Sequence, residues 1–115
     1  MIIKNITKNR TFAQDYKLCN TFFSKAKGLM FSRKKNFRNL IFVFDKEKKI
    51  GLHMWFVFFP IDVVLLDKDK RVVEIKGNLR PFRLFNSKNK AKYVLELYQD
   101  AIKKNSIELE DKIEF

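Results

Sequence analysis

Short runs of β-branched and aromatic residues, separated by polar turns, most constrain what this chain can fold into. Leu40–Phe44 is a continuous apolar run of five residues, which suits a buried strand and is too short for a helix. Ile50–Phe58 and Ile61–Asp67 are rich in Val and aromatic residues, and Pro60 marks a strand break because it cannot donate to a strand ladder. The pattern predicts a mainly β fold.

Further elements are expected around these runs. Additional strands are predicted at Ile2–Ile6, Thr11–Cys19, Arg71–Lys76, Ala91–Leu97 and Lys112–Phe115. Helices are predicted over residues 20–30 and Gln99–Asn105. Residues 45–49 and 67–70 are expected as polar turns, and residues 79–92 as a loop. Together they predict a single domain over residues 1–115, α+β by content. Its form is a compact β-barrel or sandwich of about seven or eight strands with one or two short helices.

The counts of metal-binding and redox residues restrict the chemistry. One Cys and one His exclude a disulfide framework and a cluster of zinc-ligating residues, so we expect no metal site and no cofactor. No Gly-rich phosphate loop or zinc-protease motif is present. The first residues contain no long apolar region, so we expect no signal peptide, and no apolar run reaches the ~20 residues of a membrane span. We therefore expect a cytoplasmic protein without a membrane span.

The net charge of +12 is unevenly distributed. Residues 1–40 hold 10 basic residues and 1 acidic residue, residues 41–90 hold 11 and 6, and residues 91–115 hold 4 and 6. A one-sided field of this kind attracts anionic partners. Codon bias is the alternative source, because Lys, Asn, Ile and Phe, which have A/T-rich codons, make up 51 of 115 residues.

A series of motifs resembles a known family. The motifs are Gly28-Leu29-Met30, the Leu40–Phe44 strand, His53–Val64 with its Pro60-Ile61-Asp62, Val72-Val73-Glu74, Pro81, Tyr93–Leu97 and Asp111. In this order and spacing the chain resembles the uncharacterised-protein family called domain of unknown function 192. The resemblance implies a compact β-barrel or sandwich with a helix packed on it, and no established biochemical function. Asn39, Asp100 and Glu110 stand where that family usually has Gly.

Two carboxylates interrupt apolar strands. Asp62 has apolar residues on both sides, which implies a buried carboxylate that must be hydrogen-bonded. It is either a pocket acid or an acceptor for backbone N–H groups at the Pro60 bend. Glu96 is either a solvent-facing strand residue or the partner of Asp62 across the sheet. A carboxylate pair of that kind is the raw material of acid–base hydrolysis.

Three further residues are candidates for ligand binding. His53 alternates with Trp55, so both could line one cleft, and Arg80 would supply positive charge. The alternatives are structural: His53 as a rim residue and Trp55 as part of the core. No nucleophile motif accompanies His53, which disfavours nucleophilic catalysis.

The basic charge near the N-terminus is concentrated in one cluster without acidic residues, in which aromatic residues interleave. Its members are Lys25, Lys27, Arg33, Lys34, Lys35 and Arg38. Such a cluster is typical of a surface that contacts the phosphate backbone of nucleic acid, including RNA. The alternative is a solvated, lysine-rich face.

These observations support three hypotheses for function. The first is a small ligand- or partner-binding module without enzymatic activity. It would bind an anionic or polar ligand, or a protein partner, through His53, Trp55, Asp62, Arg80 and Glu96. The second is sequence-independent nucleic-acid binding through residues 25–38. The third is a hydrolase that uses the Asp62 and Glu96 carboxylates.

Overall fold

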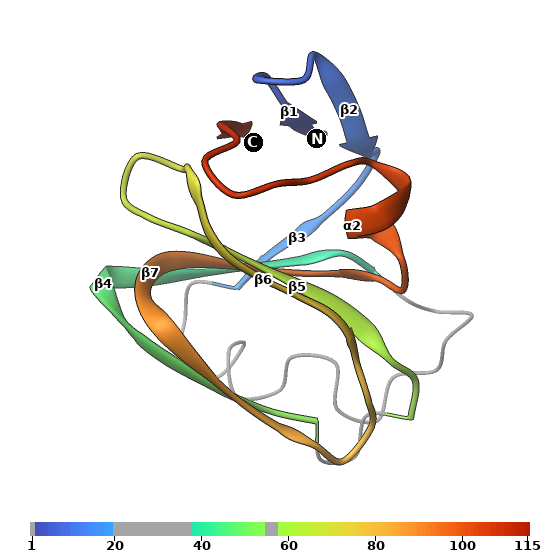
Figure 1. Cartoon of the computed structure of the whole chain (residues 1–115), viewed down its shortest axis with the longest axis vertical. Helices are drawn as coiled ribbons and strands as arrows, with labels where there is room; N and C mark the ends of the chain where they lie inside the picture. Colours follow the sequence, from blue (N-terminus) through green and yellow to red (C-terminus); the bar gives the residue numbers. More distant parts are fainter. Residues whose placement is uncertain (1, 20–37, 55–57) are drawn as a thin grey trace.

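The computed structural model describes residues 2–19, 38–54 and 58–115, which form two β-sheets (Figure 1). The larger sheet has the order β3-β4-β7-β5-β6 and the smaller sheet the order β2-β1-β8. The larger sheet contains β3 (Lys17–Cys19), β4 (Leu40–His53), β5 (Ile61–Leu66), β6 (Val72–Leu79) and β7 (Leu84–Tyr98). The smaller one contains β1 (Ile3–Asn5), β2 (Arg10–Ala13) and β8 (Ile113–Glu114), and α2 spans Ala101–Lys104.

The predicted mainly β architecture is confirmed. The described residues form eight strands and one short helix, close to the predicted number. Strands β3 and β6 are the two edges of the larger sheet, so this sheet does not close into a barrel. Of the two predicted forms, barrel and sandwich, the structure is sandwich-like.

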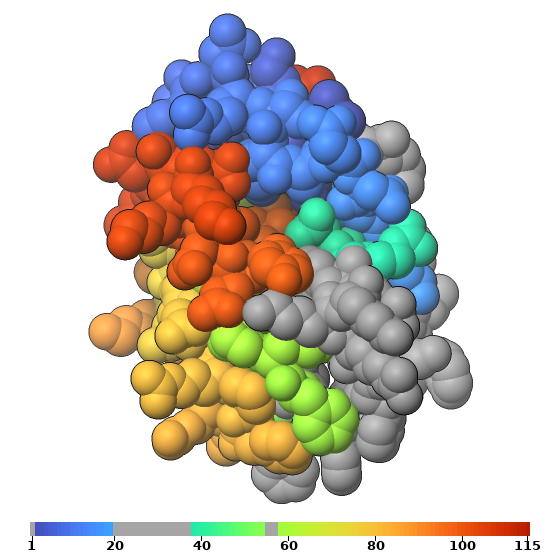
Figure 2. Space-filling model, turned by 90° about the vertical axis from the view of Figure 1, so that its right-hand side faces the viewer, coloured from blue at the N-terminus to red at the C-terminus, as the bar shows by residue number. Residues whose placement is uncertain are grey.

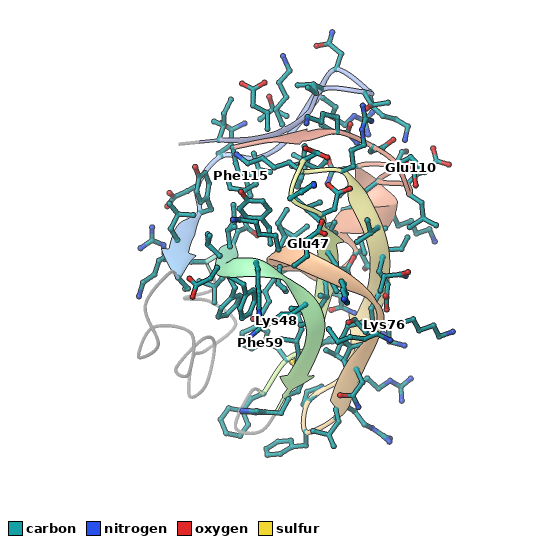
Figure 3. All side chains as sticks on the ribbon, turned by 90° about the vertical axis from the view of Figure 1, so that its left-hand side faces the viewer. Glu47, Lys48, Phe59, Lys76, Glu110 and Phe115 are labelled. Atoms are coloured by element: carbon teal, nitrogen blue, oxygen red, sulfur yellow. The ribbon has the colours of Figure 1, made fainter. Side chains whose placement is uncertain are left out.

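The larger sheet has an apolar core on each face. All six residues of β5 are buried, because β5 lies between β7 and β6 and both of its faces are covered. Val63 belongs to the core on one face and Val64 to the core on the other, as the alternation of side chains along a strand requires. Phe59 and Phe115 lie on opposite sides of the sheet (Figure 3).

The smaller sheet covers one of these faces. We call β1, β2, β8 and the segment from α2 to β8 the cap, which lies at the upper end of Figure 1. Ile3 from β1 and Ile113 from β8 pack into the same core as Leu66 and Leu95. The two ends of the chain therefore close one side of the larger sheet together.

Two segments that were predicted as polar connections belong to strands. Residues 45–49, expected as a turn, lie within β4, and the expected 79–92 loop contains the first half of β7. The two long strands pair with each other along most of their length, with register shifts between Val43 and Lys48 and between Lys49 and Gly51. These irregularities place polar residues in a strand without forcing them into the core.

Several local predictions are confirmed. The 67–70 turn joins β5 to β6, and the Lys70 N–H donates to the Asp67 carbonyl at 3.0 Å. The helix predicted over Gln99–Asn105 is present as α2. The strand predicted over Ile2–Ile6 is present as β1 and pairs with β2 in an antiparallel hairpin, whereas the Thr11–Cys19 segment divides into β2 and β3, and β3 pairs in parallel with β4. The helix predicted over residues 20–30 lies outside the described residues.

Two of the three positions where the family usually has Gly keep a backbone that favours glycine. Asp100 has φ 70° and Glu110 has φ 74°, both in the left-handed region. The chain therefore forms these turns with side chains in place of glycine.

Candidate functional site

Asp62 uses its carboxylate to hold three elements together. Oδ1 accepts a hydrogen bond from the Asn78 N–H at the end of β6 (2.9 Å), and Oδ2 accepts one from the Ile102 N–H in α2 (3.0 Å). The Asp62 side chain is buried. Both donors are backbone groups, as the structural alternative expected, although they lie far along the chain from the Pro60 bend. These bonds join β5, β6 and α2.

Glu96 is buried in β7 and is not the solvent-facing residue that one alternative expected. Its exposed fraction is 8%. The part of the chain that the structure describes donates no hydrogen bond to its carboxylate. Burial in these apolar surroundings raises the pKa of Glu96 to about 7. The carboxyl group therefore changes its charge near neutral pH.

The structure does not bring Asp62 and Glu96 together as a pair. Glu96 pairs directly with Val63, and Asp62 pairs with Leu97. Val63 and Leu97 belong to cores on opposite faces of the larger sheet. Direct partners share a face and neighbours along a strand do not, so the two carboxylates point to opposite faces. This geometry does not support a shared acid–base site.

The end of β4, which holds His53, and the connection from β6 to β7, which holds Arg80, lie at the lower end of the molecule, opposite the cap (Figure 1). His53 ends β4 and pairs with Leu84 at the start of β7. Arg80 follows β6, and the turn at residues 80–83 leads into β7. Both side chains are exposed. Trp55, the remaining member of the predicted ligand set, lies outside the described residues.

Large apolar side chains are exposed at the same end. The exposed fractions are 60% for Phe58, 52% for Phe82 and 66% for Leu84. The rings of Phe58 and Phe82 meet edge to face with centroids 5.7 Å apart. Figure 2 shows the light-green residues that follow position 57 close to the gold 79–84 connection. We call Phe58, Phe82 and Leu84, together with His53 and Arg80, the end surface.

Phe82 holds its exposed position with an unusual backbone. Its φ is 60°, which a bulky side chain seldom adopts. The Phe82 N–H donates to the Met54 carbonyl at 2.7 Å, and the Met54 N–H donates to the Arg83 carbonyl at 2.8 Å. These two hydrogen bonds fix the 80–83 turn against the segment that follows β4.

The predicted basic cluster is described only at Arg38, whose guanidinium pairs with Asp15 at 3.2 Å. Both side chains of this pair are exposed. The other members, Lys25, Lys27, Arg33, Lys34 and Lys35, lie outside the described residues. The cluster therefore remains a prediction.

A polar network around the buried Asp111 in the cap was not anticipated as a unit. Asp111 Oδ2 accepts hydrogen bonds from Asn5 Nδ2 (2.7 Å), Lys8 Nζ (2.7 Å) and the Glu108 N–H (3.0 Å). Lys8 Nζ also pairs with Glu108 at 2.8 Å. The only sequence signal was the place of Asp111 in the family motif, because nothing local relates it to Asn5 or Lys8, more than 100 positions away.

Across residues 2–19, 38–54 and 58–115, His, Cys, Asp and Glu form no group of three or more that could hold a metal ion. The described helix is also not long and apolar enough to cross a membrane.

Comparison with known proteins identifies the family. The model of domain of unknown function 192, described as an uncharacterised conserved protein family, matches residues 3–115. The chain belongs to this family. A UPF0127 protein of Thermococcus sibiricus is 33% identical over 113 residues, which are 96% of this chain and 72% of that protein. A UPF0127 protein of Pyrococcus furiosus is 32% identical over 113 residues, or 96% and 95% of the two chains.

Two solved structures share the fold. One is a protein of Sinorhizobium meliloti described as a proposed transcription regulator, with a TM-score of 0.86 and 21% identity, covering 98% of this chain and 89% of that one. The other is a protein of unknown function from Novosphingobium aromaticivorans, with a TM-score of 0.82 and 24% identity, covering 99% and 82%. At these identities the likeness shows the fold alone.

Proposed function

We propose that this member of domain of unknown function 192 is a small binding module that contacts its ligand or partner through the end surface. The observation that carries the proposal is the exposure of Phe58, Phe82 and Leu84 in one place. Contiguous apolar side chains on a protein surface are typical of an interaction site. The left-handed φ of Phe82 adds support, because backbone strain of this kind clusters at functional sites.

The chemistry of the end surface indicates what it would bind. Arg80 and Arg83 flank Phe82 in the sequence, and both are exposed. Aromatic side chains beside guanidinium groups favour a ligand or partner segment that is both apolar and anionic. Asp62 is not part of this surface because its carboxylate is engaged inside the fold, and Glu96 is buried.

The test is a thermal-shift screen of anionic and aromatic metabolites against three proteins. They are the wild type, the Phe82→Ser variant and the Ile6→Ser variant. Ile6 is an exposed apolar residue at the opposite end of the molecule, so its replacement is a matched control. We expect compounds that stabilise the wild type and Ile6→Ser but not Phe82→Ser. Failure of every compound, or equal stabilisation of all three proteins, would contradict the proposal.

A second candidate is sequence-independent nucleic-acid binding through the basic segment at residues 25–38. The excess of 10 basic residues over 1 acidic residue in positions 1–40 favours it. Affinity for single-stranded RNA should fall steeply with salt, because phosphate contacts release counterions. The Lys34→Glu/Lys35→Glu variant should bind more weakly at every salt concentration. A flat salt response would contradict this candidate.

A further inference from the structure

A groove of about 510 Å³ lies between β6 and the first half of β7. Residues 73–76 of β6 form one wall, and residues 84–89 of β7 contribute to the other. The two strands are consecutive in the chain and join through the 80–83 turn, but they diverge above it (Figure 1). The groove is thus the opening between the arms of a splayed hairpin.

On the side that faces the groove, neither β6 nor the first half of β7 pairs with a described strand. Strand β6 is an edge of the larger sheet and pairs only with β5 among the described strands. In the described part of the chain, β7 pairs with β5 only over residues 93–98, and residues 84–91 pair with β4 alone. Unpaired strand edges of this kind can accept an added strand.

Two side chains show that these edges face each other. The Glu74 carboxylate of β6 accepts hydrogen bonds from the backbone N–H groups of Lys88 and Asn89, both at 2.9 Å. The Asn89 side chain donates back to the Val73 carbonyl at 3.4 Å. Backbone amides of β7 therefore point toward β6, and a backbone carbonyl of β6 points toward β7. The side chains of Glu74 and Asn89 therefore bridge the gap between β6 and β7 at a place where no strand lies between them in the described part of the chain.

The walls combine apolar and basic groups. Ile75 and Leu84 are 37% and 66% exposed, and Lys76 and Lys88 are exposed beside them. Figure 3 labels Lys76, which belongs to β6. The one acidic side chain among the lining residues, Glu74, already accepts four hydrogen bonds from Lys88 and Asn89. Among the described residues, neither lysine forms an ion pair, so the groove offers positive charge and apolar contact area.

We propose that this groove binds an extended peptide segment of a partner protein, rich in apolar and acidic side chains, as an added strand along β6. The inference rests on the proposed binding function and names the class of partner. Main-chain hydrogen bonds to the strand edge would supply affinity, and alternate side chains would supply specificity. A second copy of this chain is disfavoured as the occupant, because each copy carries a net charge of +12.

The experiment uses fluorescence anisotropy with a labelled hexapeptide that alternates Glu and Val. We expect saturable binding by the full chain and chemical-shift changes at the amides of Ile75, Lys88 and Asn89. Replacement of the central Val of the peptide by Pro should weaken binding about tenfold, because Pro has no N–H to donate to a strand edge. Equal affinity of the two peptides would overturn strand addition.

Two protein variants with the same change of charge distinguish binding in the groove from non-specific electrostatic attraction of the acidic peptide. Lys76→Glu/Lys88→Glu reverses the two lysines of the groove, whereas Lys46→Glu/Lys103→Glu reverses two exposed lysines outside the groove lining. We expect about tenfold weaker binding for the first variant only. Equal losses in both variants would mean non-specific attraction and would overturn the proposal.

The Phe82→Ser variant separates this inference from the proposed function. If Phe82→Ser abolishes peptide binding and Lys76→Glu/Lys88→Glu does not, the end surface holds the peptide. The groove proposal then fails while the binding function stands. If neither the peptide nor any compound of the thermal-shift screen binds, both fail. A dimer in sedimentation experiments that Ile75→Ser dissociates would assign the groove to a second copy and would also overturn the proposal.

Discussion

Asp111 in the cap and Glu96 in the larger sheet are both buried carboxylates, with exposed fractions of 4% and 8%. Burial alone would raise the pKa of Asp111, but hydrogen bonds from Lys8, Asn5 and the Glu108 N–H, together with the charge of Lys8, lower it below its usual value. Glu96 receives no hydrogen bond from the described residues, and burial raises its pKa to about 7. The donors around a buried carboxylate, and not burial by itself, decide its charge state.

Asp111 and Glu96 are both buried acids, but they have different roles in this fold. Asp111 is a structural anion that ties the beginning of the chain to its end through Asn5 and Lys8. Glu96 carries no such connection within the described residues and weakens the folded state when it ionises. The two groups therefore predict opposite dependences of stability on pH.

The largest expected effect is the loss of the cap anion. Asp111→Ala leaves the fully buried Asn5 amide and the Glu108 N–H without their acceptor, and we expect a loss of roughly 3 kcal/mol in the free energy of unfolding. Urea denaturation at pH 7 measures it. Glu114→Ala is the control, because Glu114 is an exposed carboxylate in the adjacent β8. Equal losses in the two variants would mean that Asp111 is not a structural anion.

Glu96 should make the stability of the fold depend on pH in the direction opposite to that of Asp111. The pKa of Glu96 is higher in the folded state, about 7 against its ordinary value of 4.5, so the folded state binds the proton more tightly. Stability should fall by up to about 3 kcal/mol as the pH rises from about 4.5 to about 7. Glu96→Gln should remove this fall and be more stable than the wild type at pH 8.

The measurement for Glu96 is urea denaturation of both proteins at several values between pH 4 and pH 8. Below pH 4 the wild type should lose stability again, because the lowered pKa of Asp111 stabilises the fold only while that carboxylate is ionised. If the difference between wild type and Glu96→Gln does not change with pH, Glu96 does not titrate as its surroundings predict.

Asp62 provides an intermediate case, because two backbone N–H groups satisfy its carboxylate. Asp62→Ala should cost about 2 kcal/mol, since the Asn78 and Ile102 amides lose their acceptors. Urea denaturation again measures the loss, with Asp45→Ala, an exposed carboxylate of β4, as the control. Compounds found with the thermal-shift screen should still stabilise Asp62→Ala. Loss of their effect would place Asp62 in the binding site after all.

The sequence predicted the elements whose signals are local. Ile61–Asp67 and Ala91–Leu97 contain enough β-branched and apolar residues to mark β5 and the second half of β7. Residues 45–49 and 84–92 were misassigned because strand pairing overrides polar composition, whereas residues 80–83 do form the expected connection. A long partner strand holds such residues in place through backbone hydrogen bonds, which side-chain patterns do not report.

The candidate site was harder to predict for a related reason. Whether Asp62 and Glu96, which are 34 positions apart in the sequence, share a face depends on the register between β5 and β7. A shift of one residue would have placed them on the same face. The exposure of Phe82 depends on a left-handed backbone in the 80–83 turn, and no local pattern places a bulky residue there.

The smallest predicted effect comes from backbone strain at two turns. Asp100 and Glu110 adopt φ angles of 70° and 74° at positions where the family resemblance implies Gly. A left-handed φ costs about 1 kcal/mol or more for a residue with a Cβ, and replacement by Gly removes this cost. Part of the gain in stability is offset because Gly has greater conformational freedom in the unfolded chain. Asp100→Gly and Glu110→Gly should therefore each raise the Tm by about 3 °C.

Neither substitution removes a side-chain hydrogen bond of this kind. The Asp100 side chain makes no capping hydrogen bond to α2, and the bonds of Glu110 to Val72 and Arg71 use its backbone. Asn39→Gly is the matched control, since Asn39 has no positive φ and its side chain donates to the Asp15 carbonyl. It should lower the Tm, and a similar decrease in all three variants would show that these turns hold no strain that glycine relieves.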